Sequence, residues 1–462
     1  MSRGPRRPGW AFAVALGTLV GSLVGLTAAP QSPDPRPNVI LVVTDDQTAD
    51  TLPSDPPAMP WLQSRFADPS TGWIRFPEAI AATPMCCPSR ATLLTGLTAE
   101  HHGVTSNEDG TDLDETDTLA VWLHDAGYTT GLVGKYLNGY PWDRGPYVPP
   151  GWDRWFAKTN DALATTYEGY GVVDQGAWRR YGSTPGDYVT DVLGREAVSF
   201  VRTAPGDRPW FLYLASPAGH APWTPAPRHA GLLADVPPEP PSEAALNDVD
   251  DLPAWIRALP PIDGARAAAL QADRIRARET LLAVDEQLRA TWQAVVARGE
   301  QDRTVVIFVS DNGFQFGEHR WVGKQTPYEP SIRVPFVVRS PWMEGGTDGT
   351  LVSTIDVAPT IAGLAGISPF PAMDGLDLSD IISGREPSFD RLGVPISWDG
   401  GDDVPAWEGL RTRRATYVRW ADGTVEEYRL RDDPDQLHPV PLRGRARDDR
   451  GLADILVGST SG

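Results

Sequence analysis

The chain has 462 residues and carries 41 Lys and Arg against 61 Asp and Glu, a formal net charge of −20. This acidity excludes a general binder of nucleic acid or of anionic membranes, because both require a basic protein face. The composition, 41% hydrophobic and 22% charged, is typical of a globular protein and excludes a disordered or fibrous chain. The two cysteines, Cys86 and Cys87, are neighbours, so they build no disulfide framework.

Residues 1–29 are typical of a secretory signal peptide. Three arginines precede an uncharged run over residues 10–27, which is followed by Ala28 and Ala29. The pattern predicts export, with a Pro-rich linker over residues 30–37 and a secreted, extracytoplasmic product. The alternative is a retained N-terminal anchor, since a run of about 18 residues is just long enough to span a bilayer. The protein is expected to contact a membrane only in that case.

The first expected strand is Asn38 to Val43 (NVILVV), and a second is Thr304 to Val309 (TVVIFV). Both are continuous apolar runs, which indicates strands buried on both faces, as in a parallel sheet. Helical spacing of apolar residues appears between them, at 118–126 and in the long segment 265–298. Strands that alternate with helices predict an α/β sandwich. Residues 217–260 are rich in Pro and acidic residues, which predicts a surface excursion near a site.

The pattern changes near residue 388. Short alternating segments at 415–420 (ATYVRW) and 424–430 (TVEEYRL) flank the turn Ala421, Asp422, Gly423. This is typical of a hairpin. We therefore expect a catalytic domain over residues 38–388 and a small antiparallel subdomain with a tail over residues 389–462.

Both buried runs end in short oxygen-bearing side chains. The first leads into Asp45 and Asp46, and the second into Asp311 and Asn312. Ligands of open α/β sheets bind at the carboxyl ends of strands, so the two pairs can converge if the strands are close together. Three carboxylates and one amide oxygen select a hard cation, Ca²⁺ or Mg²⁺, over zinc. The competing interpretation is that each Asp only forms a turn or a helix cap.

The run from Cys86 to Gly96 (CCPSRATLLTG) contains the chain's only cysteines. Pro88 and Ser89 favour a helix start and Gly96 favours its end, so Cys86 is expected just before a short helix. The helix N-terminus favours an anion and would lower the pKa of a thiol there. The alternative is a cysteine that serves as a small buried hydrophobe.

The run also carries the pattern CxPSRxxxLTG, and in it the chain resembles the type I, formylglycine-dependent sulfatases of the alkaline phosphatase superfamily. Further segments follow the order of that family: NVILVVTDDQ at 38–47, GKYLN at 134–138, PAGHAP at 217–222, VIFVSDNG at 306–313, GK at 323–324 and EEYRLRDDPDQL at 426–437. The CCPSR variant, GKYLN and YEPSIRVPF at 328–336 are most similar to N-acetylglucosamine-6-sulfatases and extracellular endosulfatases. The resemblance covers residues 37–440 and implies a large mixed β-sheet flanked by helices.

The resemblance assigns a role to individual residues. It implies that a formylglycine-generating enzyme converts Cys86 to formylglycine, whose hydrate is the nucleophile and also contacts the metal. The ion, Ca²⁺ or alternatively Mg²⁺, would be held by the four strand-end residues described above. Sulfate-stabilising roles fall on Arg90, Lys135 and Lys324, and the role of proton donor to the leaving alcohol falls on His220. Cys87 is expected to be inert.

One position departs from a common family pattern. Many sulfatases have a histidine two residues after the lysine of GKWH, where this chain has Leu137. The group that helps to expel sulfate is therefore left open, because neither Leu137 nor the adjacent Asn138 can act as a base.

The expected substrate is a sulfated small molecule or glycan, of N-acetylglucosamine-6-sulfate type in one version, with exo or endo action left open. Two other functions compete: a phosphonate or phosphate ester hydrolase on the same scaffold, and a non-catalytic glycan-binding homologue. The acidic net charge favours a small or sparsely sulfated sugar over a densely sulfated polymer.

Overall fold

A computed structural model describes residues 34–159, 167–235, 241–367, 372–386, 391–401 and 403–440, together with Met1 and Gly4. The compact unit of the chain begins at Asp34. Apart from Met1 and Gly4, the predicted signal peptide lies outside the described residues, as do residues 30–33 of the predicted linker and the tail beyond residue 440. In the part of the chain that the structure describes, no helix has the length and apolar character needed to cross a membrane.

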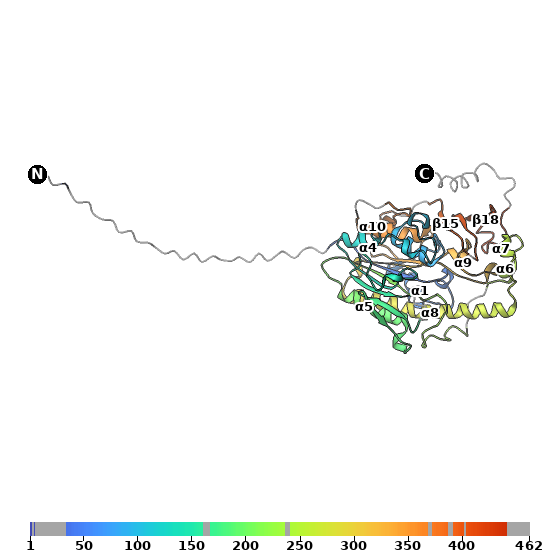
Figure 1. The fold of residues 1–462 in the computed structure, drawn as a ribbon, viewed down its shortest axis with the longest axis horizontal. Coiled ribbons are helices and arrows are strands. Elements are labelled where there is room, and N and C mark those ends of the chain that lie inside the picture. Colours follow the sequence, from blue (N-terminus) through green and yellow to red (C-terminus); the bar gives the residue numbers. More distant parts are fainter. Residues whose placement is uncertain are drawn as a thin grey trace. The chain divides into compact units, whose positions relative to one another are not determined.

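A mixed ten-stranded sheet forms the centre of the compact unit (Figure 1). Its strands, in spatial order, are β13 (Gly346–Thr347), β2 (Trp73–Arg75), β12 (Phe336–Arg339), β9 (Thr304–Ser310), β1 (Asn38–Thr44), β8 (Trp210–Ala215), β4 (Thr129–Lys135), β5 (Arg154–Lys158), β6 (Gly171–Asp174) and β7 (Ala177–Arg180). The strands β9, β1, β8, β4 and β5 run parallel, and the strands beside them run antiparallel. Every residue of β1 and β9 is buried, because strands lie on either side of them and helices cover both faces of the sheet. This explains their continuous apolar runs.

Alternate residues of β1 enter two different cores. Val39, Leu41 and Val43 belong to one apolar cluster, and Ile40 and Val42 belong to the other. Helices cover each face, with α4 and α10 on one side and α5 and α8 on the other (Figure 1). The protein is therefore an α/β sandwich, which confirms the predicted fold class.

The helices of the compact unit vary from one turn to 34 residues. They are α1 (Pro60–Phe66), α2 (Cys86–Thr95), α3 (Ala99–His102), α4 (Leu119–Asp125), α5 (Val189–Thr203), α6 (Glu243–Asn247), α7 (Ala254–Arg257), α8 (Gly264–Ala297), α9 (Glu329–Ile332), α10 (Val357–Leu364) and α11 (Ser379–Ile382). The predicted long helix 265–298 corresponds to α8, and α6 and α7 lie in the predicted excursion 217–260.

A four-stranded antiparallel sheet follows the main sheet in the chain, as predicted. Its strands are β15 (Val394–Trp398), β16 (Trp407–Arg411), β17 (Ala415–Trp420) and β18 (Val425–Arg429). One apolar cluster joins this sheet to Ile80, Ile332 and Leu351 of the preceding chain. Two short pairs complete the described strands: β10 (Gln315–Phe316) with β11 (Val322–Gly323), and β3 (Ala79–Ile80) with β14 (Val352–Ser353).

Candidate active site

Adjacent parallel strands carry functional candidates to one edge of the main sheet. Thr44 of β1 lies beside Ser310 of β9 in register, so the residues that follow each strand emerge together. Lys135 is the last residue of β4, and His220 lies in the loop after β8. The predicted convergence of the two strand ends is therefore present, because β1 and β9 are direct neighbours.

The backbone turns sharply at Asp46, which has a left-handed conformation with φ 58°. This conformation costs about 1–3 kcal/mol for a residue with a side chain and is most common at functional sites. The Asp46 amide donates to Asp311 Oδ1 at 3.2 Å, and Asp46 Oδ1 accepts from Asn312 Nδ2 at 2.7 Å. Gly219 is needed here, since a Cβ at that position would lie 2.1 Å from the Asp45 carbonyl oxygen.

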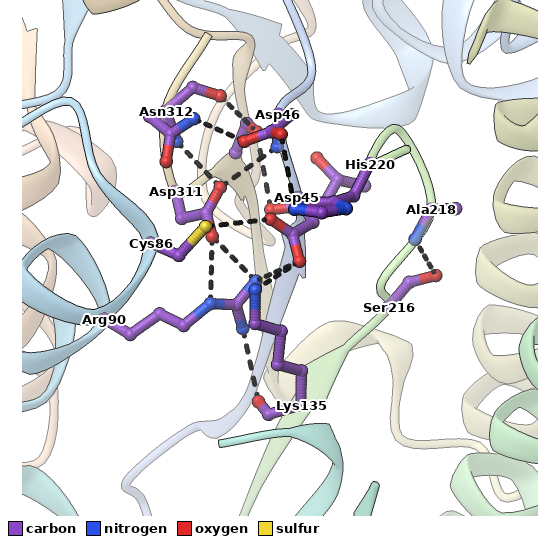
Figure 2. A network of polar contacts seen from close by, with 12 residues as sticks. Asp45, Asp46, Cys86, Arg90, Lys135, Ser216, Ala218, His220, Asp311 and Asn312 are labelled. Carbon is purple, nitrogen blue, oxygen red and sulfur yellow. Dashed lines mark hydrogen bonds and ion pairs between the residues drawn. The ribbon is translucent and has the colours of Figure 1, made fainter. Parts of the chain in front are cut away.

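Cys86 is the first residue of α2, so the helix begins earlier than the sequence predicts, which places Cys86 just before it. Its Sγ donates to Asp45 Oδ1 at 3.4 Å and accepts from Lys324 Nζ at 2.6 Å. Figure 2 shows Cys86 and Arg90 reaching toward Asp45 and Asp311, with His220 on the other side of Asp45. The helix ends as predicted at Gly96, which has φ 70°.

The expected low pKa of the Cys86 thiol is wrong. Burial and the neighbouring Asp45 carboxylate raise this pKa to about 12, against the partial effect of Lys135 and Lys324. The helix N-terminus is therefore too weak to outweigh desolvation at a fully buried sulfur. Unmodified Cys86 is a neutral thiol, which is a poor nucleophile.

Two cationic side chains hold the carboxylates in place. Arg90 is fully buried, and its Nη2 lies 2.8 Å from Asp311 Oδ2 and 3.6 Å from Asp45 Oδ2. Lys135 Nζ donates to Asp45 Oδ2 at 2.6 Å. Ser89, one residue before Arg90, donates from Oγ to the Asp311 carbonyl oxygen at 2.5 Å. The sequence predicts Ser89 only as a helix starter, and its place inside the motif is the signal that indicates this second role.

Gly134 explains how Lys135 reaches this position. Its φ is 122°, and a Cβ on it would lie 1.9 Å from the carbonyl oxygen of Ala215 in β8. Only glycine allows the end of β4 to approach β8 so closely. In the GK pair, Gly134 thus allows the close backbone approach and Lys135 provides the positive charge.

Two of the candidates, Lys324 and His220, lie in loops. Lys324 follows β11, and its Nζ donates to Asp46 Oδ1 at 2.5 Å. His220 Nε2 lies 3.7 Å from Asp46 Oδ2, and its Nδ1 faces the Ala221 carbonyl oxygen at 2.7 Å. The His220 side chain keeps 37% of its surface exposed, whereas the other candidates are buried. His220 is therefore the candidate at which a leaving group can reach solvent.

Three carboxylates and three cations share this site, so their formal charges cancel. Burial raises the pKa of Asp45, but Lys135, His220 and Arg90 lower it more, and the result is well below the usual value. Burial and the nearby Asp45 charge instead raise the pKa of Asp311 to about 6. A divalent cation would leave the site with an excess positive charge, which suits an anionic substrate.

The donor set fits such a cation. One carboxylate oxygen each of Asp45, Asp46 and Asp311 lies within 4.8 Å of the others. Asn312 Oδ1 is buried and accepts no hydrogen bond within the described residues, an arrangement that a metal ion would satisfy. Oxygen donors of this kind favour Ca²⁺ or Mg²⁺.

Other polar residues near the motif have structural partners. His101 contacts Asp374, and His102 contacts Thr92 Oγ1. Cys87 is buried in the core, and burial raises its pKa to about 11. Glu318 pairs with Arg274 at 3.4 Å.

A pocket of about 440 Å³ is lined by residues that follow the strand-end candidates in the chain. The lining includes Thr48 and Phe314, which come two residues after Asp46 and Asn312, respectively. Four carboxylates line it, Asp50, Glu318, Glu329 and Asp435, against two arginines, Arg274 and Arg333. The pocket is therefore large enough for a sugar and acidic in balance.

Comparisons with known proteins show the family of the chain. The family model described as Sulfatase matches residues 37–367, and the model described as N-sulphoglucosamine sulphohydrolase, C-terminal, matches residues 317–446. The human N-acetylglucosamine-6-sulfatase is 31% identical over 384 residues, which cover 79% of this chain and 68% of the relative. The extracellular sulfatase SULF-1 homolog of Drosophila melanogaster is 30% identical over 365 residues, 76% of this chain and 32% of the relative. The chain thus spans only a third of that longer relative.

Solved structures share the fold. A protein in complex with its substrate D-glucosamine-2-N,6-O-disulfate superposes with a TM-score of 0.77 at 22% identity, over 92% of this chain and 97% of the other. The phosphonate monoester hydrolase of Agrobacterium radiobacter gives 0.72 at 23% identity, over 92% and 95%. With the family model covering most of the sequence and the motif residues assembled at one sheet edge, the chain belongs to the sulfatase family.

Proposed function

We propose that this chain is a formylglycine-dependent sulfatase that removes sulfate from a sulfated sugar outside the cytoplasm. The observation that carries the proposal is the position of Cys86. Its sulfur lies at the start of α2, in contact with Asp45 and Lys324. Burial raises the pKa of this thiol to about 12, so little reactive thiolate forms there. Conversion to an aldehyde hydrate would supply an oxygen nucleophile at the same place.

Asp45, Asp46, Asp311 and Asn312 would hold a divalent cation, together with residue 86. When bound, the ion would lower the pKa of a hydroxyl beside it and neutralise sulfate oxygens. Ca²⁺ is our assignment for the ion, with Mg²⁺ as the alternative. Arg90 keeps two of these carboxylates oriented through its ion pairs with Asp45 and Asp311.

The reaction would proceed at residue 86. A hydroxyl oxygen of the hydrate bonds to sulfur while the bond from sulfur to the ester oxygen breaks. Lys135 and Lys324 offset the negative charge of the sulfate oxygens, and His220 gives a proton to the departing sugar oxygen. The second hydroxyl of the hydrate then loses its proton, sulfate leaves from carbon, and the aldehyde is restored for rehydration by water.

We assign the substrate to small or sparsely sulfated sugars of the N-acetylglucosamine-6-sulfate type. The pocket that begins near Thr48 and Phe314 supports this choice, since its lining carboxylates outnumber its arginines by four to two, a balance that disfavours a second sulfate group. The human relative is named for that substrate. We also propose that the chain is exported, and the Drosophila relative is likewise named as an extracellular sulfatase.

Parallel assays with 4-nitrophenyl sulfate and a 4-nitrophenyl phosphonate ester test the reaction class. The protein should be produced together with a formylglycine-generating enzyme and supplied with Ca²⁺ or Mg²⁺. We expect a higher kcat/KM for the sulfate ester. A clear preference for the phosphonate ester would favour the phosphonate hydrolase alternative, and no turnover by fully converted protein would favour a glycan-binding homologue.

A further inference from the structure

Lys324 depends on a short backbone turn that nearby Trp321 and two other segments hold in place. Gln325, the next residue, has a left-handed backbone with φ 78°. For a residue with a side chain this conformation costs about as much as the strained turn at Asp46, so it persists only where the surroundings fix it. The turn therefore needs external partners to keep Lys324 Nζ against Asp46 and Cys86.

Two indole groups supply those partners. Trp321 Nε1 donates to the Lys324 carbonyl oxygen at 2.9 Å, and Trp407 Nε1 donates to the Gln325 carbonyl oxygen at 2.7 Å. The Gln325 amide in turn donates to the carbonyl oxygen of Pro84 at 3.1 Å, two residues before Cys86. Both carbonyls and one amide of the turn are thus fixed from outside it.

The two indoles belong to a group of four tryptophans, which we call the tryptophan clasp: Trp255, Trp321, Trp407 and Trp420. Trp255 of α7 packs edge-on against Trp321 and against Trp420, with ring centroids 5.6 Å apart in each pair. Trp420 of β17 packs against Trp407 of β16 at 6.4 Å. Such pairs resist rotation of the rings and keep their N–H groups aimed.

We infer that Trp407 is a positioning residue for Lys324, through which the C-terminal sheet supports sulfate binding at the main-sheet edge. Trp407 is 3% exposed and lies one hydrogen bond from the residue after Lys324. Loss of its N–H would let the strained turn relax and would move the ammonium group away from the sulfate. This inference rests on the proposed function of Lys324 in binding sulfate.

The test is a double-mutant cycle with Trp407→Phe and Lys324→Met on converted, metal-loaded enzyme. Phe keeps an aromatic ring and removes the indole donor. We expect Trp407→Phe alone to lower kcat/KM for 4-nitrophenyl sulfate about 3- to 10-fold, mainly through KM, with matching weaker inhibition by inorganic sulfate. In the Lys324→Met background the same change should cost less than about 2-fold, because its effect passes through the lysine.

Trp398→Phe is the matched control. Trp398 is also 3% exposed in this sheet, but its Nε1 donates to Val404 within the sheet region at 3.2 Å. It should leave KM within about 1.5-fold of the parent while its effect on unfolding matches that of Trp407→Phe. Mass analysis of the peptide with residue 86 checks that each variant is converted equally.

The outcomes separate the two claims. An equal loss from Trp407→Phe in both Lys324 backgrounds, or an equal loss from Trp398→Phe, would overturn the positioning role. Undiminished sulfate hydrolysis by the Lys324→Met single variant would instead contradict the proposed function on which the role rests.

Discussion

Apart from Cys86 and Arg90, which α2 carries, the candidate side chains form two groups that the fold positions in different ways. The strand-end group consists of Asp45, Asp46, Lys135, Asp311 and Asn312, and the register of neighbouring parallel strands places it. The loop-borne group consists of His220 and Lys324, which hydrogen bonds from other segments place. The Tyr167 hydroxyl donates to the His220 carbonyl oxygen at 2.7 Å, and two indoles hold the turn at Lys324.

This difference teaches which parts of the site tolerate change. A strand end is held by many ladder bonds shared along the sheet, so only its side chain can be removed cleanly. A loop residue relies on a few specific donors, so distant substitutions can move it. The predictions below test that contrast.

The largest effect is expected from Asp46→Asn in the strand-end group. The change removes a carboxylate that accepts from Lys324 and Asn312, and with it a donor proposed for the cation. We expect kcat/KM for 4-nitrophenyl sulfate to fall by more than about 10³-fold. Asp207→Asn, at an exposed surface carboxylate, is the control and should have no effect. Near-parent activity of Asp46→Asn would remove this residue from the site.

His220→Ala tests the loop-borne group. A proton donor matters most when the leaving oxygen is strongly basic, so the loss should depend on the substrate. We expect about 10²-fold lower kcat for a sugar sulfate and less than about 5-fold for 4-nitrophenyl sulfate, whose leaving group needs little protonation. His438→Ala, at an exposed histidine, serves as control. Equal losses on both substrates would argue against the acid role.

Gly134→Ala tests how tightly the strand end is built. The new methyl group would meet the Ala215 carbonyl oxygen at 1.9 Å, in a residue with φ 122°. We expect the free energy of unfolding to fall by at least about 3 kcal/mol, as measured by urea denaturation. Gly176→Ala has a positive φ of 77° but open space around it, and should cost only about 1 kcal/mol. Similar costs would show that the close approach of β4 to β8 is not required.

The smallest effect concerns the sheet that supports Lys324. Burial raises the pKa of Glu426 from 4.5 to about 7, although Tyr428 and Trp420 donate hydrogen bonds to it. Because the folded protein holds this proton more tightly than the unfolded chain, the contribution of Glu426 to stability is highest below about pH 4.5 and falls as pH rises to about 7.

Glu426→Gln removes this titration while Gln can still accept from Trp420. The variant should therefore be about 2 kcal/mol more stable than the parent at pH 8, relative to their difference at pH 5. Urea denaturation at both pH values measures this, with Glu408→Gln, at a half-buried carboxylate of the same sheet, as control. A difference that does not change with pH would contradict a raised pKa at Glu426.

The strand-end metal candidates could be predicted from the residues alone, because a buried strand followed by short oxygen side chains has a physical meaning without any relative. The roles of Lys135, Lys324 and His220 came only from the family resemblance, since an isolated lysine or loop histidine has no such signature. The tryptophan clasp could not be predicted at all, because its members are 165 residues apart from Trp255 to Trp420 and no local pattern joins them. The Cys86 pKa was missed because the sequence shows the helix start but not the depth of burial.

The central claim is that residue 86 acts as formylglycine, and one titration tests it directly. Preparations with different converted fractions of Cys86 can be made by varying the formylglycine-generating enzyme, and conversion lowers the peptide mass by about 18 Da. We predict that kcat for 4-nitrophenyl sulfate rises in proportion to the converted fraction and extrapolates to zero for the unconverted protein. Activity that is independent of that fraction would contradict the account.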